Sequence, residues 1–242
     1  MSPTASLPNT WPVPHTWSLP QRLVAETIGT AMLLLVVVGS GIWAQRLCGG
    51  NDGLAHLANS LATAAGLVVL IWTFADVSGA HFNPAVTAMA VARRELSPAV
   101  ALQYAIAQLV GAAAGVALTH AMFELPLVTI SAMARSGWGR ALGEGVATFG
   151  LLVTIVGVGR RRADSVAVAV GLFILAGYWC TSSMSFANPA VTLARTLTDS
   201  AAGIRPADVP LFLLGQGLGM AAALLLGRWL WPVAVTRVDD AV

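Results

Sequence analysis

Two short stretches decide the fold: Phe82-Asn83-Pro84-Ala85-Val86-Thr87 and, in the second half of the chain, Ala187-Asn188-Pro189-Ala190-Val191-Thr192. Both contain the tripeptide Asn-Pro-Ala. Asn is a favoured N-cap and Pro a favoured first residue of a helix, so each tripeptide predicts the start of a helix. The apolar segments that follow, about 84–94 and 189–198, are too short to cross a bilayer.

The composition is that of a protein whose solvent is lipid. Of 242 residues, 57% are hydrophobic and only 10% are charged, which is too apolar for a soluble domain of this length. The formal charge of +2 is too small to suggest a nucleic-acid partner. Cys48 and Cys180 are too few for a disulfide framework or a metal site. We expect an integral membrane protein with no cofactor and no metal.

Six further stretches are long and apolar enough to span the bilayer. They are residues 21–44, 54–76, 98–121, 138–159, 165–183 and 208–231. Backbone that is not helical cannot face lipid, because its unpaired N–H and C=O groups are costly there. The two Asn-Pro-Ala segments must therefore fold back inside the protein. This predicts an all-α membrane protein with six transmembrane helices and two re-entrant half-helices.

The two halves of the chain repeat each other. Glu26-Thr27-Ile28-Gly29-Thr30 resembles Glu144-Gly145-Val146-Ala147-Thr148, and Tyr104, Gln108 and Gly111 have the spacing of Phe212, Gln216 and Gly219. Three spans per repeat is an odd number, so the repeats are predicted to be inverted, with the half-helices meeting near the midplane. The expected division is a disordered Pro-rich tail (1–20), a channel domain (21–232, with repeats of about 21–121 and 138–231) and a C-terminal tail (233–242).

Arginines near the span ends predict the orientation. With both termini in the cytoplasm, eight arginines lie inside and five outside. The inner set is Arg22, Arg93, Arg94, Arg160, Arg161, Arg162, Arg228 and Arg237, and the outer set is Arg46, Arg135, Arg140, Arg195 and Arg205. We therefore expect both termini on the cytoplasmic side of the cell (inner) membrane.

The sequence resembles the major intrinsic protein family of aquaporins and glycerol facilitators. The resemblance is carried by Ala25-Glu26-Thr27-Ile28-Gly29-Thr30, Ser78-Gly79-Ala80-His81-Phe82-Asn83-Pro84-Ala85-Val86-Thr87 and Phe186-Ala187-Asn188-Pro189-Ala190. It implies a homotetramer with one passive pore per subunit. It also implies that the carboxylates of Glu26 and Glu144 bind the backbone of the re-entrant loops, and that His81 lines the pore near its cytoplasmic mouth.

The resemblance further implies a filter of four positions, counted from the two motifs: Thr63, Ala176, Ser185 and Val191. Water-selective and glycerol-selective relatives place bulky side chains and an Arg among these positions. Here the Arg is replaced by Val191, so a wide ring without charge is expected. Cys180 and Arg195 lie one turn beyond Ala176 and Val191 and are further pore-lining candidates. The alternatives are a packed thiol for Cys180 and a salt bridge of Arg195 with Asp199.

This ring resembles that of a bacterial branch associated with arsenic resistance. The resemblance implies passive conduction of undissociated arsenite, As(OH)3, and methylated arsenicals, beside glycerol-like solutes and water. A general glycerol or urea channel and an ordinary water channel are the alternatives within transport. An intramembrane hydrolase using Ser40 or Ser78 lacks a suitably placed base, so no enzyme is expected. A structural protein with a closed pore is the last rival.

Overall fold

Six long helices enclose two short ones in the described part of the chain. The computed structural model describes residues 17–231, and this range contains helices and no strands. The long helices are α1 (Leu19–Leu47), α2 (Asp52–Ser78), α4 (Pro98–Met122), α5 (Trp138–Gly159), α6 (Val166–Cys180) and α8 (Val209–Leu230), and the short ones are α3 (Pro84–Ala92) and α7 (Pro189–Ala194). Six segments are long and apolar enough to cross a membrane. The predicted fold class is confirmed.

The ends of the helices follow local sequence signals. Gln21 accepts a hydrogen bond from the backbone N–H of Ser18, so α1 begins at Leu19, slightly before the predicted start of the span. Asn51 caps α2. Short 3₁₀ turns occupy 163–165, 195–197 and 206–208. Residues 1–16 and 233–242 of the predicted tails lie outside the described residues, as does residue 232 at the end of the predicted channel domain.

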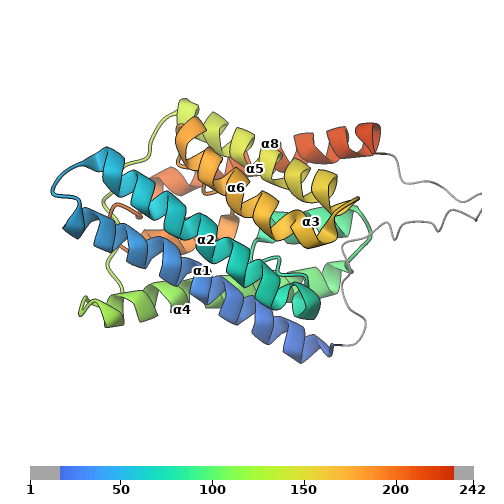
Figure 1. Cartoon of the computed structure of the whole chain (residues 1–242), viewed down its shortest axis with the longest axis horizontal. Coiled ribbons are helices and arrows are strands. Elements are labelled where there is room, and N and C mark those ends of the chain that lie inside the picture. The colour runs from blue at the N-terminus through green and yellow to red at the C-terminus, as the bar shows by residue number, and fades with distance from the viewer. Residues whose placement is uncertain (1–16, 232–242) are drawn as a thin grey trace, which may run out of the picture.

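The two halves use the same helix pairings. In the first half α1 packs against α4 and α2, and in the second half α5 packs against α8 and α6. Helices α2 and α6 join the halves, while α3 and α7 contact each other and both α4 and α8 lie against them. The start of α1 and the end of α8 lie at the same end of the bundle (Figure 1). This arrangement brings the two half-helices together in the interior.

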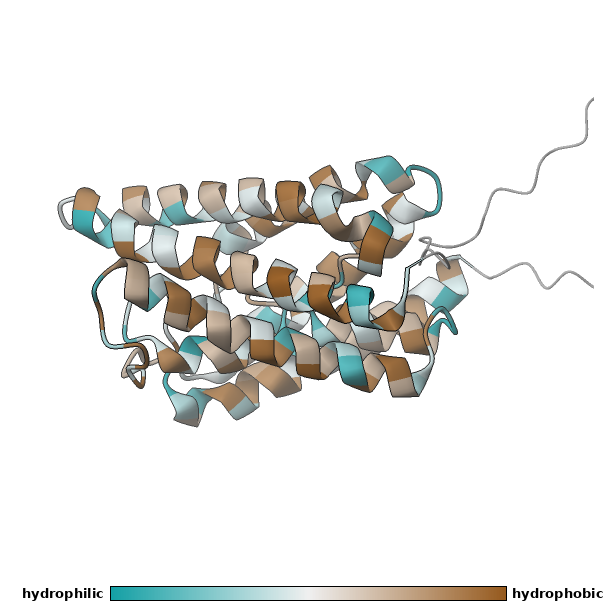
Figure 2. Ribbon diagram, turned by 90° about the horizontal axis from the view of Figure 1, so that it is seen from below, coloured by the Kyte–Doolittle hydropathy of each residue, from teal (hydrophilic) through white to brown (hydrophobic). Residues whose placement is uncertain are grey.

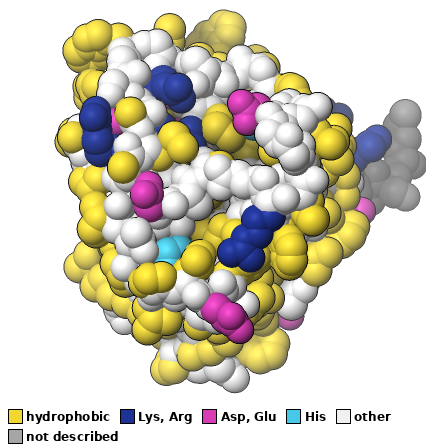
Figure 3. Space-filling model, turned by 90° about the vertical axis from the view of Figure 1, so that its left-hand side faces the viewer, with side chains coloured by type: hydrophobic (Ala, Val, Ile, Leu, Met, Phe, Trp, Pro, Cys, Tyr) yellow, Lys and Arg dark blue, Asp and Glu magenta, His cyan; other side chains and the backbone are white. Residues whose placement is uncertain are grey.

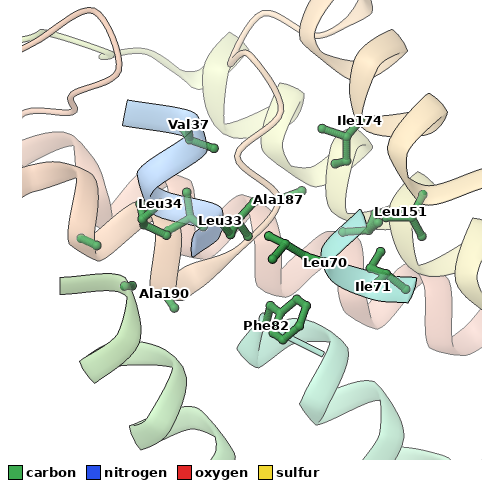
Figure 4. Packing of buried hydrophobic residues seen from close by; sticks show 14 of the residues in the cluster. Leu33, Leu34, Val37, Leu70, Ile71, Phe82, Leu151, Ile174, Ala187 and Ala190 are labelled. Carbon is green, nitrogen blue, oxygen red and sulfur yellow. The ribbon is translucent and has the colours of Figure 1, made fainter. Parts of the chain in front are cut away.

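Hydrophobic residues cover the outside of the bundle as well as its core. Along the helices the ribbon is mostly apolar, with polar residues gathered toward the ends (Figure 2). Trp72, Leu102 and Trp229 are exposed large side chains of this surface, as expected where lipid is the solvent. In the interior, Phe82 and Ala187 lie among apolar side chains of α1, α2, α5 and α6 (Figure 4).

Glycines allow the closest helix pairs to touch backbone to backbone. A Cβ on Gly111 or Gly115 of α4 would lie 2.2 Å from a carbonyl oxygen of α1. A Cβ on Gly219 of α8 would lie 2.2 Å from the Gly145 oxygen of α5. Small residues four apart are the usual means of close helix packing in membranes, where lipid leaves van der Waals contact as the main attraction.

We predict that Gly219→Val destabilises the protein by about 1–3 kcal/mol, because the added side chain overpacks the contact between α8 and α5. Thermal unfolding of the detergent-solubilised protein measures the effect. Gly217→Val is the matched control, since a Cβ at Gly217 meets nothing within 4 Å. Equal melting temperatures for the two variants would contradict this account of the packing.

Candidate functional site

The two Asn-Pro-Ala turns are joined by reciprocal hydrogen bonds. Asn83 Oδ1 accepts from the Ala85 N–H at 2.8 Å, so Asn83 caps α3. Asn188 caps α7 in the same way, accepting from Ala190 N at 3.0 Å. Asn83 Nδ2 donates to the carbonyl of Ala187 at 2.7 Å, and Asn188 Nδ2 donates to that of Phe82 at 2.8 Å. The starts of the half-helices therefore face each other.

The loops that enter the two turns share an uncommon backbone conformation. Ala80 and Phe82 have φ of 50° and 49°, and Ser185 and Ala187, at the matching positions before Asn188, have φ of 49° and 46°. Non-glycine residues rarely adopt a positive φ, and they hold it only where their surroundings impose it. The same irregular conformation has thus been built twice, once in each repeat.

A buried carboxylate imposes this conformation in the first repeat. Glu26 Oε1 accepts from the Ser78 hydroxyl at 2.6 Å and from His81 N at 2.9 Å. Glu26 Oε2 accepts from Phe82 N at 2.7 Å and from Gln108 Nε2 at 2.8 Å. The side chain is fully buried. Its four donors satisfy it and fix the loop ahead of α3.

Glu144 does the same in the second repeat. Its carboxylate accepts from Phe186 N at 2.8 Å and Ala187 N at 2.9 Å, and also from Gln216 Nε2. Gln216 in turn donates to the Thr192 hydroxyl at 2.8 Å. Neither glutamate is among the residues that line the cavity described next. The geometry favours positioning over proton relay for both carboxylates.

A cavity lies between the half-helices and extends toward both ends of the bundle. Thr63, Tyr178, Ser185 and Arg195 line it on the side toward the α1–α2 loop, and Arg93, Glu95 and Arg160 on the opposite side. The remaining lining residues are Leu33, Val37, Leu67, Ile71, Gly79, Ala80, His81, Phe82, Asn83, Val86, Met89, Ala90, Leu151, Leu152, Ile155, Val156, Gly159, Val166, Val170, Ile174, Phe186, Asn188 and Val191. Both capping asparagines thus border the cavity.

The predicted filter is brought together only in part. Thr63, Ser185 and Val191 all line the cavity. The residue that faces Thr63 from α6 is Tyr178, whose hydroxyl lies 3.3 Å from the Thr63 hydroxyl. The Ser185 hydroxyl is buried and has no hydrogen-bond partner within residues 17–231.

The structure contradicts the assignment of Ala176 and Cys180. Neither lines the cavity, and both side chains are exposed on the outside of α6. The expected packed thiol at Cys180 is wrong for the same reason. The count from the second motif fails because the segment between Tyr178 and Asn188 is irregular. A sequence signal was present, since Val166, Val170, Ile174 and Tyr178 line the cavity and recur every four residues, as on one face of a helix.

The expected ring without charge is also wrong. Arg195 lines the cavity, and only 1% of its surface is exposed. Its Nε donates to the Ala202 carbonyl, and its Nη2 has no protein partner. The alternative salt bridge with Asp199 is not formed, because Asp199 Oδ1 accepts from the N–H of Ala132. Arg195 thus lines the same cavity as Val191, which lies four residues earlier in the chain.

A second buried arginine lies beside the first. Arg135 belongs to the loop between α4 and α5 and is 4% exposed. Burial, followed by the positive charges of Arg195 and Arg140, lowers the pKa of Arg135 to about 9. The surface at this end carries scattered basic and acidic groups among hydrophobic ones (Figure 3). Sequence reasoning missed Arg135 because a loop arginine outside any motif gives no signal of burial.

The opposite end of the cavity is also polar. The ring of His81 lies 5.4 Å from that of Tyr104, and His81 Nδ1 lies 3.1 Å from the Thr87 hydroxyl. Closer to the end of the bundle, Arg93 Nε and Glu95 Oε1 form a salt bridge of 2.8 Å. Polar groups therefore line the cavity on both sides of the two Asn-Pro-Ala turns.

Comparisons with known proteins agree with this architecture. The family model "Major intrinsic protein" matches residues 14–164, more than half of the chain. Aquaglyceroporin AqpS of Rhizobium meliloti (strain 1021) is 48% identical over 214 residues, covering 88% of this chain and 91% of that protein. The probable aquaporin AqpM of Archaeoglobus fulgidus is 28% identical, covering 89% of this chain and 98% of that protein.

A solved structure shares the fold. The X-ray structure of the aquaglyceroporin from Plasmodium falciparum superposes with a TM-score of 0.67 at 21% identity, covering 88% of this chain and 95% of that one. Together with the family match, this shows that the chain belongs to the major intrinsic protein family, whose aquaporin and aquaglyceroporin members are membrane channels for water and small solutes, not enzymes.

Proposed function

We propose that the chain is a passive channel for small neutral hydroxylated solutes, with glycerol and undissociated arsenite, As(OH)3, as representative substrates beside water. The observation that carries the proposal is that both polar and apolar residues line the cavity. Three hydroxyl-bearing residues, Thr63, Tyr178 and Ser185, line it together with Asn83 and Asn188. Such groups replace the water molecules that a hydroxylated solute must shed.

Apolar side chains form another part of the cavity wall. Val37, Ile174 and Val191 line it beside the polar groups. A solute with several hydroxyls and a carbon or arsenic centre presents polar and less polar sides in one molecule. Leaving a polar group unpaired in such a passage costs roughly 1–3 kcal/mol, so a passage with hydroxyls available favours solutes that can use them. As(OH)3, like glycerol, carries three hydroxyls on a compact centre.

Several positive charges oppose the passage of cations. The N-terminal ends of α3 and α7, which carry partial positive charges, meet at the centre, and the Arg195 guanidinium lies at the outer ring. Cations therefore meet a barrier at two depths. Anions must still lose their hydration in an apolar passage. Neutral solutes avoid both penalties.

We also propose that the end of the bundle holding the start of α1 faces the cytoplasm, and that the protein works as a homotetramer in the cell (inner) membrane. The orientation is supported by the sequence, which predicts eight arginines on the cytoplasmic side against five on the outer side. The assembly is an expectation from the family to which the chain belongs.

Proteoliposomes that contain the purified protein test the solute class. We expect glycerol to re-swell vesicles shrunk in a glycerol gradient faster than empty vesicles, and arsenite, but not the arsenate anion, to enter at neutral pH, as measured by arsenic content. Water flux without any glycerol or arsenite flux would contradict the proposal and identify an ordinary water channel.

The position of the α6 residue in the filter gives a second prediction. Tyr178→Ala should raise the permeability to polyols larger than glycerol, because it removes a ring and a hydroxyl from the cavity wall. Ala176→Leu should leave all permeabilities unchanged, since Ala176 is exposed on the outside of α6. The same osmotic assay measures both. An effect of Ala176→Leu without one of Tyr178→Ala would restore the original count from the motif.

The third prediction concerns Val191, the proposed filter residue on α7. Val191→Arg should reduce glycerol and arsenite flux more than water flux, because it fills the lumen and adds a second cation near Arg195. Two unit charges about 4 Å apart at an effective dielectric near 20 repel by roughly 4 kcal/mol. Val191→Leu adds bulk without charge and is the control. Unchanged flux of all solutes in Val191→Arg would remove Val191 from the filter.

A further inference from the structure

We propose that Arg135 is a positioning residue that holds Arg195 in the filter, acting through the ring of Phe186 and the turn at 201–203. Arg135 itself does not line the cavity. The inference rests on the proposed function, because it assigns part of the selectivity of that channel to a loop residue. Two sets of contacts and one electrostatic argument support it.

The first is a run of three carbonyls shared by the two arginines. Arg135 Nη2 donates to the Ala201 carbonyl at 2.7 Å, and Arg135 Nε donates to the Gly203 carbonyl at 2.6 Å. The carbonyl between them, that of Ala202, accepts from Arg195 Nε. The rigid fork of a guanidinium suits such paired acceptors. Arg135 thus fixes both ends of the turn whose middle residue holds Arg195.

The second is an aromatic ring shared by the same two side chains. The guanidinium carbon of Arg195 lies 3.4 Å from the Phe186 ring centroid, and that of Arg135 lies 5.1 Å from it. Both distances are in the range of cation–π attraction. Phe186 is itself held by its N–H bond to Glu144 at 2.8 Å and by its edge contact with Phe212 at 5.1 Å. The ring is therefore a fixed support for both cations.

The third is electrostatic. Neither guanidinium has a carboxylate within salt-bridge distance, and both salt bridges found in residues 17–231 lie elsewhere. Two like charges that share a buried support repel each other. The Nε of Arg195 is bound to the Ala202 carbonyl, its Nη2 has no hydrogen-bond partner among residues 17–231, and Arg195 lines the cavity. Arg135 thus acts on Arg195 both through the shared turn and ring and through its positive charge.

Arg135 is firmly placed. Its backbone N–H donates to Asp208 Oδ2 at 2.7 Å, and its Nη1 contacts the Met184 sulfur at 3.1 Å. Asp208 also binds Arg205 Nη2 at 3.1 Å from the outer side. Arg205 belongs to the same surface, yet no contact joins it to Phe186 or to the carbonyls at 201–203. Arg205 is therefore the matched control.

A double-mutant cycle tests the proposal. Arg135→Met, Arg195→Met, the double variant and Arg205→Met are reconstituted into liposomes, and the permeability of a five-carbon polyol is measured relative to that of water. We expect each single change at Arg135 or Arg195 to raise this ratio about fivefold, the effect of losing one ordinary polar interaction. The double variant should match Arg195→Met, because Arg135 acts only through Arg195. Arg205→Met should behave as the wild type, and Arg135→Lys should recover part of the discrimination.

Two results would overturn the inference. One is an unchanged ratio in Arg135→Met. The other is an Arg135→Met effect that persists in full when Arg195 is already Met, since that would indicate a general loosening of the loop. If Arg135→Met does not fold, Arg135→Gln replaces it in the same cycle, because it removes the guanidinium and keeps a polar side chain at a position that does not line the cavity. Polyol flux through the wild type reports separately on the proposed function, because a channel that conducts only water can still gain polyol flux in the variants.

Discussion

Backbone groups that leave a helix inside a membrane must find partners within the protein, and the rest of this structure depends on how that need is met. Two loops, ending at Phe82 and Ala187, enter the interior with positive φ angles. Their backbone N–H groups therefore have no partners of the kind that a regular helix provides. Glu26 and Glu144 each bind two consecutive backbone N–H groups of these loops. Without the carboxylates, those groups would stay unpaired, and the half-helices would have no fixed starting point.

The same solution used twice gives the pore its symmetry. Each carboxylate is held by a glutamine of the neighbouring long helix, Gln108 or Gln216, and each glutamine also bonds a threonine of the half-helix. Asn83 and Asn188 then each donate a hydrogen bond to a backbone carbonyl of the opposite loop. Removal of either carboxylate would leave the buried donors that it accepts from without a partner, and unpaired buried polar groups are costly.

The sequence predicts this part of the structure because every member lies in a repeated pattern. Asn-Pro-Ala, the paired glutamates and the glutamines at equal spacing are recognisable along the chain, and the chemistry of each permits few roles in lipid. The filter is different. Its α6 member, Tyr178, is separated from the second motif by an irregular segment, so counting gave Ala176, which faces outward. Helical periodicity within α6 is the better guide there, because it does not depend on the length of a loop.

Arg195 shows that a valine at position 191 does not by itself make the surrounding cavity wall uncharged. Val191 and Arg195 lie four apart, on the same side of the turn that begins with α7 and continues as a 3₁₀ helix. Val191 is smaller than an arginine would be at that position, and Arg195, four residues later in the chain, places a cation in the same wall. The guanidinium then depends on the loops around it for its place, because its side chain is long and its Nε bond is to the turn at Ala202. The filter that we propose therefore includes contacts of the loops between α4 and α5 and between α7 and α8, outside both Asn-Pro-Ala motifs.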